Sequence, residues 1–291
     1  MSINTRTLDH IIHLTPPGTV EQVSKQFSEL GFHVLPGGTH ADGLTANALV
    51  VFADGVYLEL ISFTHPASHY PAGSPERKQR DNHTWAQKSP GWIDYAFLGN
   101  GSHTESISAT INERSRKEGS GVVYNPEQDG GRTRPDGQIL KWLISGPQPE
   151  QRGILPFFCG DVTPRSLRVP NQPASNTKHP STARGIAFVR ILVKPPLFQS
   201  TSRQLTSVVG SSPTISTNVD YAEWVLDTTH DGGAAQPRLL LAVPSNNDES
   251  SFLESIATGS GIHEVAFQVE PGTKSGSETT PYGKISWVSS K

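Results

Sequence analysis

Hydrophobic and polar positions follow one order twice along this chain. In the first stretch, an apolar strand is followed by a helix that opens with the capping-box spacing of Thr19 and Gln22 and ends at Gly31. The residues after this helix then predict three further strands. The expected elements are strands over 7–14, 32–35, 46–52 and 56–63, with the helix between the first two. The stretch therefore predicts one β-α-β-β-β unit.

The second stretch repeats this order. It predicts a strand over 92–98, a helix that carries Ile107 and Ile111 and stops at Gly119, and strands over 121–124, 131–134 and 138–144. An Asp-Gly pair precedes the last strand of each copy, 44 positions after His10 in the first copy and 42 positions after Asp94 in the second. Self-similarity at this spacing predicts a duplicated structural unit, with Asp54-Gly55 and Asp136-Gly137 at equivalent turns.

The rest of the chain divides into a proline-rich stretch and a weaker repeat. Six prolines fall within 148–180, interrupted by the apolar run 154–159, which predicts an extended connector whose apolar part packs on another element. Beyond it, strands over 185–193, 221–227 and 238–243 and a helix over 197–209 suggest a degraded third copy, and 251–289 a shortened fourth. We therefore expect domains at 1–147 and 181–291, joined by the connector 148–180.

Composition narrows the classes of function. A net charge of -3 over 291 residues offers no basic surface for nucleic acid. No apolar run approaches the roughly 20 residues needed to span a bilayer, and the N-terminal segment lacks a signal-peptide core. The single cysteine, Cys159, rules out an internal disulfide and suits a reducing compartment. We expect a cytoplasmic protein with a small-molecule partner and with neither nucleic acid nor membrane as a partner.

Several short motifs resemble one superfamily. They are Leu8-Asp9-His10, Leu30-Gly31-Phe32, Gly37-Gly38-Thr39-His40, Tyr57-Leu58-Glu59-Leu60, Arg134-Pro135-Asp136-Gly137, Leu155-Pro156-Phe157-Phe158 and His179-Pro180. With the repeated unit, they resemble the glyoxalase-like branch of the vicinal oxygen chelate superfamily. The resemblance implies an α+β fold of the glyoxalase/dihydroxybiphenyl dioxygenase type, in which repeated βαβββ units form curved mixed sheets with helices packed outside. Members of this superfamily include isomerases, dioxygenases, lyases and resistance proteins.

The resemblance also implies a divalent metal within the curved sheet. Its ligands would stand on the first and last strands of each unit, which in the first copy are His10 and Glu59, both competent to bind Zn, Ni, Mn or Fe. His40 lies in a glycine-rich loop that could bring a third ligand over the mouth of the sheet. Glu59 and His40 are also the candidates for moving a proton during catalysis.

The second copy departs from this pattern. Alignment of the copies puts Asp94 in the place of His10 and Lys141 in the place of Glu59. A protonated lysine has no lone pair for a metal, so we expect Asp94 and Lys141 to pair within the same cavity, where both are candidates for substrate binding. Asn47, a polar residue on a predicted strand, is a further candidate for substrate binding. Arg132 and Arg134 could orient an anionic substrate, or Arg134 could form a salt bridge with Asp136 or Asp129.

The leading hypothesis is a metal-dependent enzyme of isomerase or lyase type that acts on a small oxygenated metabolite. No phosphate loop or dinucleotide fingerprint is visible, so no nucleotide cofactor is expected. Two histidines and one carboxylate would also suit an Fe(II) dioxygenase. A third alternative is a metal-free protein that binds or sequesters a small molecule, which Lys141 in a ligand position favours. Repeats that pair within one chain suggest a monomer or weak homodimer.

Overall fold

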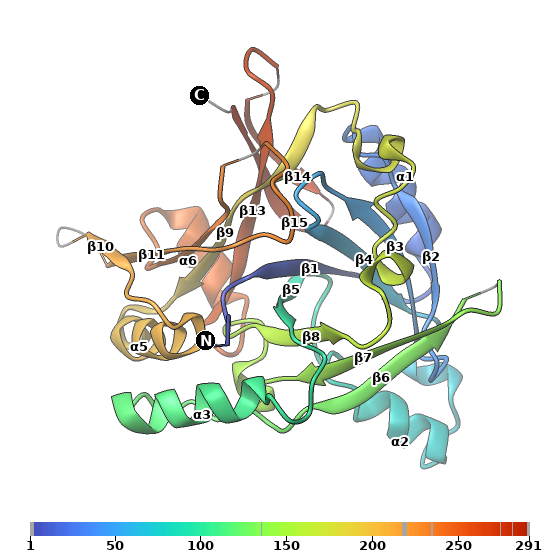
Figure 1. Cartoon of the computed structure of the whole chain (residues 1–291), viewed down its shortest axis with the longest axis horizontal. Coiled ribbons are helices and arrows are strands. Elements are labelled where there is room, and N and C mark those ends of the chain that lie inside the picture. The colour runs from blue at the N-terminus through green and yellow to red at the C-terminus, as the bar shows by residue number, and fades with distance from the viewer. Residues whose placement is uncertain are drawn as a thin grey trace.

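The computed structural model contains two curved mixed sheets, each built from two neighbouring units (Figure 1). It describes residues 3–134, 136–216, 220–233, 235–273, 275–280 and 282–289. Pro135, part of one of the motifs above, lies outside the described residues. This mixed α+β architecture, with curved sheets and helices outside them, confirms the fold class expected from the sequence.

The first sheet has eight strands in the order β2-β3-β4-β1-β5-β8-β7-β6. Their bounds are β1 Leu8–Thr15, β2 Leu35–Thr39, β3 Thr45–Val51, β4 Tyr57–Phe63, β5 Gly91–Gly99, β6 Gln128–Thr133, β7 Ile139–Ser145 and β8 Phe157–Asp161. β1 pairs in parallel with β4, β5 pairs in parallel with β8, and the two units meet through the antiparallel pair β1 and β5. The two halves of the sheet therefore have the same strand connectivity.

The second sheet repeats the arrangement with seven strands, in the order β10-β11-β12-β9-β13-β15-β14. The bounds are β9 Ala183–Val193, β10 Thr214–Ser216, β11 Tyr221–Val225, β12 Arg238–Ala242, β13 Ser260–Val269, β14 Gly276–Thr280 and β15 Gly283–Ser289. In the described part of this sheet, the first unit has four strands and the second has three. The division of the chain into two domains and a connector stays a prediction, because the two sheets share one hydrophobic core.

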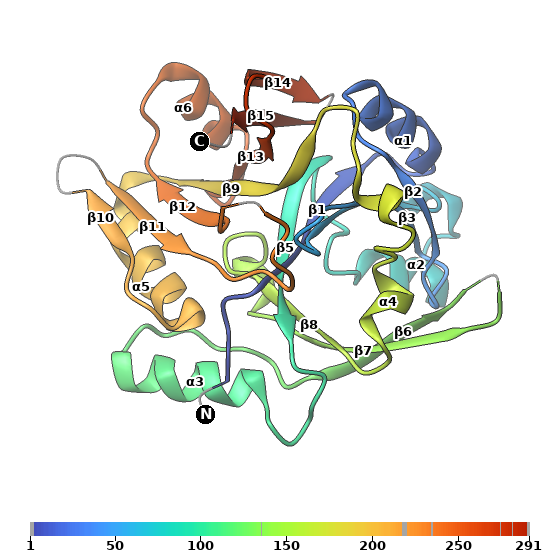
Figure 2. The ribbon, with the colours of Figure 1, turned by 45° about the horizontal axis from the view of Figure 1, so that its top comes forward.

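The helices pack against the faces of these sheets. They are α1 Val20–Glu29, α2 Pro75–Asp81, α3 Ile107–Glu118, α4 Arg165–Arg168, α5 Phe198–Val209 and α6 Asn247–Glu254, and short 3-10 turns span Ala67–His69, Pro149–Gln151, Ala174–Thr177 and Pro195–Leu197. Helices α3 and α5, one from each half of the chain, lie side by side (Figure 2). In the described part of the chain, no helix combines the length and apolar character needed to cross a bilayer.

Local signals account for the ends of the two unit helices, but the capping box expected at Thr19 was wrong, because its hydroxyl donates to the Pro16 carbonyl and does not cap α1. Val23 and Phe27 are the buried stripe of α1, as their spacing predicts. α3 begins after Ser106, which caps it by accepting the backbone N–H of Ala109. Gly119 ends α3 at φ 67°, a left-handed conformation that glycine adopts without a steric cost.

Two element assignments in the second unit were wrong. Residues 121–124 form no strand but a loop, from which Val122 and Tyr124 pack into the core. Residues 157–161, within the expected connector, form β8, which lies between β5 and β7 in the sheet. The apolar run after Pro156 therefore packs by joining the sheet itself.

Strand β8 changes the internal alignment of the two units. By its place in the sheet, β8 is the counterpart of β4, and β7 is the counterpart of β3. Asp54-Gly55 joins β3 to β4, whereas Asp136-Gly137 joins β6 to β7. The expectation that the two turns are equivalent was wrong, since near-equal spacing did not reveal that the second copy carries one more strand after its turn.

The burial of His13 on β1 predicts a pH dependence of the free energy of unfolding. His13 is fully buried, its Nδ1 has no hydrogen-bond partner in the described structure, and burial lowers its pKa from 6.5 to about 3. As the pH falls, His13 is protonated in the unfolded chain at a higher pH than in the folded protein. The free energy of unfolding should therefore fall as the pH drops below about 6.5.

Between pH 7 and pH 5 we expect His13 to account for a loss of about 2 kcal/mol, measurable by urea unfolding across that range. In His13→Gln this part of the pH dependence should vanish, whatever the absolute stability of the variant. His103→Gln, at an exposed position, should keep it. Equal slopes in His13→Gln and the parent would contradict the prediction.

Candidate functional site

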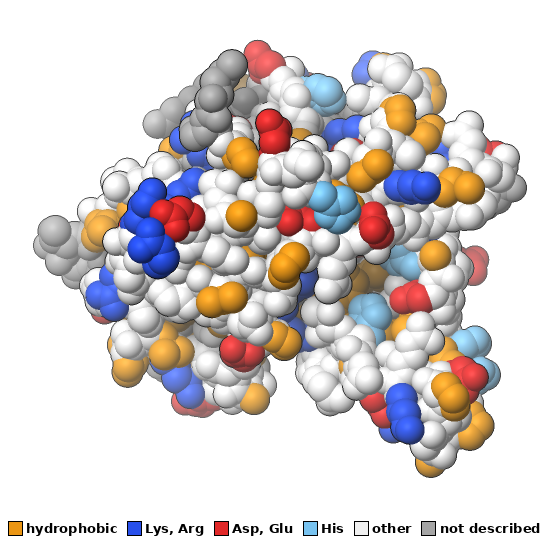
Figure 3. Space-filling model, turned by 60° about the horizontal axis from the view of Figure 1, so that its bottom comes forward, with side chains coloured by type: hydrophobic (Ala, Val, Ile, Leu, Met, Phe, Trp, Pro, Cys, Tyr) orange, Lys and Arg blue, Asp and Glu red, His pale blue; other side chains and the backbone are white. Residues whose placement is uncertain are grey.

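A cavity of about 460 Å³ lies within the curve of the first sheet. Figure 3 shows a hollow on this face, with histidine and hydrophobic side chains inside it. The cavity has a size typical of small-molecule sites. It is lined by His10, His40, Ala41, Asp42, Thr45, Asn47, Leu49, Tyr57, Glu59, His83, Thr84, Trp85, Asp129, Gly130, Gly131, Arg132, Trp142, Ile144, Arg152, Phe157, Cys159 and Arg168.

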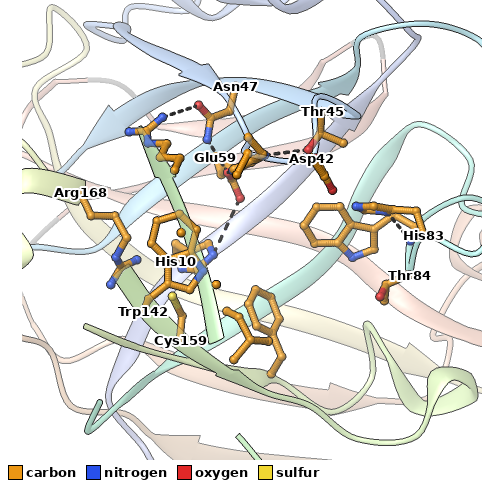
Figure 4. A pocket seen from close by; sticks show the side chains of 18 of the residues that line it. His10, Asp42, Thr45, Asn47, Glu59, His83, Thr84, Trp142, Cys159 and Arg168 are labelled. Atoms are coloured by element: carbon orange, nitrogen blue, oxygen red, sulfur yellow. Dashed lines mark hydrogen bonds and ion pairs between the residues drawn. The ribbon is translucent and has the colours of Figure 1, made fainter. Parts of the chain in front are cut away.

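Glu59 is the centre of the polar part of this cavity (Figure 4). Its Oε1 accepts a hydrogen bond of 2.5 Å from Asn47 Nδ2 and lies 3.6 Å from His40 Nε2. Its Oε2 lies 3.9 Å from His10 Nε2. The carboxylate sits on β4 between two leucines, and the cavity-facing partners offset the cost of burying it. The structure thus brings together His10, His40, Asn47 and Glu59, four of the candidates named from the sequence.

Asp9 determines how the His10 ring is held. Its carboxylate lies 2.7 Å from His10 Nδ1. Burial by itself would raise the pKa of Asp9, but the charges of Arg168 and Arg165 outweigh that effect and hold the pKa well below its usual range. An ionised carboxylate can only accept hydrogen bonds, so His10 Nδ1 carries a proton and donates it. His10 Nε2 is then the ring nitrogen turned toward Glu59.

Neighbouring side chains fix the orientation of the two histidine rings. The Tyr57 ring stacks on His10 with a centroid separation of 4.6 Å and an interplanar angle of 11°. Arg168 Nη1 donates to the Tyr57 hydroxyl over 2.8 Å. His40 follows β2 in a short loop, and its Nδ1 lies 2.7 Å from Thr45 Oγ1. Both histidines therefore present Nε2 to the cavity.

The expected pairing of Asp94 with Lys141 was wrong. Asp94 is fully buried on β5 and pairs with Arg152, with 2.5 Å between Arg152 Nη2 and Asp94 Oδ2. The same oxygen accepts the indole N–H of Trp85 over 3.0 Å. Lys141 is exposed on the opposite face of β7 from Trp142, so it does not line the cavity. The alternation of side chains along a strand explains this placement, once β7 is recognised as the counterpart of β3.

The counterpart of Glu59 therefore lies on β8 instead of β7. The residues that β8 presents to the cavity are Phe157 and Cys159. Burial raises the pKa of Cys159 to about 12, so this thiol stays protonated near neutral pH. Strands β7 and β8 consequently line their part of the cavity with apolar groups, and the charged lining residues on this side are Asp129 and Arg132 on β6 and, in the proline-rich stretch, Arg152 and Arg168.

The two candidate arginines separate in the structure. Arg132, on β6, lines the cavity, and its Nη1 lies 3.4 Å from Asn47 Oδ1. Arg134 is outside it and forms a 2.9 Å salt bridge with Asp136, one of the alternatives left open by the sequence. Because Asn47 also binds Glu59, it connects Arg132 to the centre of the polar cluster.

Sequence reasoning missed four groups that shape the site. They are Asp9, Trp85, Arg152 and Arg168. Only Asp9 carried a local signal, since it precedes His10 directly. Arg152 and Arg168 belong to the proline-rich stretch and reach the site through contacts with Asp94 and Asp9, respectively.

His10, His40 and Glu59 are of residue types that bind divalent metals, although their side chains stand slightly too far apart to hold an ion as they are placed. Among the described residues, no three His, Cys, Asp or Glu side chains are already arranged to hold an ion. Two ligands at about 2.1 Å from a tetrahedral ion stand about 3.4 Å apart. The separations of Glu59 from His40 and His10, 3.6 and 3.9 Å, exceed that value by only about 0.2 and 0.5 Å.

Comparisons with known proteins agree with this architecture. A family model described as "Glyoxalase-like domain" matches residues 8–209. No curated protein matches the chain in sequence. A crystal structure of a hypothetical protein from Staphylococcus aureus superposes with a TM-score of 0.67 at 14% identity, covering 97% of this chain and 99% of that one. A triple mutant of 4-hydroxymandelate synthase from Streptomyces coelicolor superposes at 0.50 and 13% identity, over 92% of this chain and 72% of that one. Both likenesses concern the fold.

The Asp94 pairing generates a stability prediction. Arg152→Ala removes the partner of a fully buried carboxylate and should lower the free energy of unfolding by about 3–5 kcal/mol. Lys141→Ala, at an exposed position without an ion-pair partner in the described structure, should change it by less than about 0.5 kcal/mol. Denaturant unfolding of both variants at pH 7 checks the contrast. Equal losses in the two variants would contradict the assignment of Arg152 as the partner of Asp94.

Proposed function

Since the chain belongs to the family of glyoxalase-like domains, we propose that it is a metal-dependent enzyme of isomerase or lyase type, acting on a small oxygenated molecule in the cavity of the first sheet. The observation that carries the proposal is the convergence of two imidazole nitrogens on one carboxylate: His10 Nε2 and His40 Nε2 both lie within 4 Å of Glu59. Imidazole and carboxylate are suitable ligands for Zn, Ni, Mn and Fe.

The surroundings of His10 support its role as a ligand. The hydrogen bond from Nδ1 to Asp9 leaves Nε2 as the nitrogen available to a metal. A histidine that binds a metal often donates its other ring N–H to a carboxylate. This hydrogen bond fixes the tautomer of the ring and makes the metal-binding nitrogen more basic. Within the cavity, a bound divalent ion would polarise an oxygen of the substrate.

The chain's own residues would carry out the remaining tasks. Glu59 Oε1 lies between Asn47 Nδ2 and His40 Nε2, so a proton taken from the substrate by this carboxylate can be shared with His40. His40 is held by Thr45 and is about one fifth exposed, which leaves it accessible from the cavity mouth. His40 serves either as third ligand or as proton carrier, and the metal content of His40→Ala separates the two roles.

A second candidate function is metal-free binding of a small molecule. It is favoured by the second unit, where β8 presents Phe157 and Cys159 to the cavity and Asp94 is committed to Arg152. A site whose ligands come from one unit alone would hold an ion less firmly. The two candidates differ in one measurable quantity, the amount of metal bound per chain.

We expect the purified parent protein to hold close to one divalent ion per chain by elemental analysis, and His10→Ala and Glu59→Gln to hold about tenfold less or none. Asp42→Asn, at another acidic residue of the cavity wall that has no contact with Glu59, is the matched control and should retain the ion. Absence of metal from a parent protein refolded with Zn, Ni, Mn or Fe, or unchanged metal content in both variants, would move the assignment to the metal-free binding protein.

A further inference from the structure

The charge of the cationic side chains along the cavity wall is unevenly compensated. Arg152 is paired with Asp94, and Arg168 is paired with Asp9 and Asp161. Arg132 is the exception: in the described part of the chain no carboxylate oxygen lies within ion-pair distance of it, and its hydrogen bond is a long one, 3.4 Å to Asn47 Oδ1. A guanidinium stays charged at neutral pH, so a positive charge without a direct ion-pair partner in the described structure faces the cavity.

Most of the hydrogen-bonding capacity of Arg132 is unused. A guanidinium has five N–H donors in a planar fork, and Asn47 engages one nitrogen at the limit of hydrogen-bond length. The side chain reaches from edge strand β6 toward edge strand β2, where a Cβ at Gly38 would lie 3.3 Å from Arg132 Nη1. The guanidinium group of Arg132, called the fork below, therefore lies between the two edge strands of the sheet. Its planar pair of N–H donors matches a carboxylate in shape and charge.

A flat apolar wall lies next to this fork. Trp142, on β7, lies against Gly130 of the neighbouring strand, where any side chain would collide with the indole. Trp142 and Ile144 pack with Phe157 in one hydrophobic cluster that borders the cavity. Gly130 and Gly131 precede Arg132 on β6, so that strand adds no side chains between the fork and the indole. The arrangement offers one cationic end and one aromatic surface.

We propose that the cavity recognises a small monocarboxylate with a flat, apolar body, in which Arg132 binds the carboxylate and the indole of Trp142 stacks on the body. The proposal rests on the proposed function, because it concerns the same cavity, and it adds the class of substrate. The side-chain amide of Asn47 lies between Arg132 and Glu59 and forms a hydrogen bond with each. A substrate carboxylate bound to Arg132 would therefore be separated from the Glu59 carboxylate by this amide. The reacting part of the molecule would then extend from Arg132 toward Glu59.

Binding of three simple probes tests the proposal without any need for turnover. Benzoate has the charge and the flat ring, benzamide lacks the charge, and cyclohexanecarboxylate lacks the flat ring. We expect the parent protein to bind benzoate with a Kd of about 1 mM or below, and each of the other two at least about tenfold more weakly. Titration calorimetry measures all three, and the fluorescence of cavity tryptophans gives a second readout.

Substitutions of Arg132 and Trp142 test separately the binding of the carboxylate and the stacking on the flat body. Arg132→Gln should weaken benzoate binding at least about tenfold and abolish the preference over benzamide, whereas Arg134→Gln should change neither, because Arg134 is paired with Asp136 outside the cavity. Trp142→Leu should abolish the preference of benzoate over cyclohexanecarboxylate. Circular dichroism of each variant confirms that the fold is intact.

Titrations in the presence and absence of EDTA distinguish this proposal from the metal hypothesis. Arg132-dependent benzoate binding by the metal-free protein supports the proposal even if no ion is ever found. Binding that requires metal and is unaffected by Arg132→Gln would overturn it, because the ion would then hold the carboxylate. Equal affinity for benzoate and benzamide, or no benzoate binding by the parent up to about 10 mM, would overturn it as well.

Discussion

The buried carboxylate of Asp9 is the constraint on which the cavity depends. It lies on β1 with no exposure to solvent, and two arginines of α4 compensate its charge. Removing either partner of such a group from the interior costs several kcal/mol, so the ion pairs hold α4 against the floor of the curved sheet. The same carboxylate orients His10, and Arg168 reaches on to the hydroxyl of Tyr57, which stacks on that histidine. The position of one imidazole is thus tied to the packing of a segment more than 150 residues away.

The two sheets share a plan but use their concave faces differently. In the first sheet, the concave face remains open and lined with ionisable groups. In the second, α6 packs over the corresponding surface, with Leu253 against Leu192 and Ala242 and with Glu249 paired to Arg190 at 2.6 Å. A helix inserted there satisfies the buried charges and removes the space that a ligand would need. The repeat therefore supplies a framework, and the cavity of about 460 Å³ lies in the first sheet.

Asymmetry between the two units of the first sheet gives the cavity a direction. One side carries Glu59, His10 and Asn47, while the facing strands contribute Phe157, Ile144 and the indole of Trp142. Asp94, the residue that would balance this asymmetry, is instead used to hold Arg152 and Trp85 in place. A molecule that enters the cavity meets polar groups at one end and an apolar surface at the other, which favours one orientation over its reverse.

The sequence by itself determined the features that depend on local periodicity and on single residues. The repeated unit, the buried stripe of α1, the stop of α3 at Gly119, and the placement of His10 and Glu59 on strands could be predicted, because alternation and caps are properties of a few consecutive residues. The tertiary structure alone decided which strands pair and which charges meet. The proline-flanked run 157–161 forms strand β8, between β5 and β7. Lys141 points away from the cavity, and Asp94 pairs with Arg152, which follows it by 58 positions in the sequence. Strand pairing and buried ion pairs are settled by the packing of distant segments, and no local pattern encodes that choice.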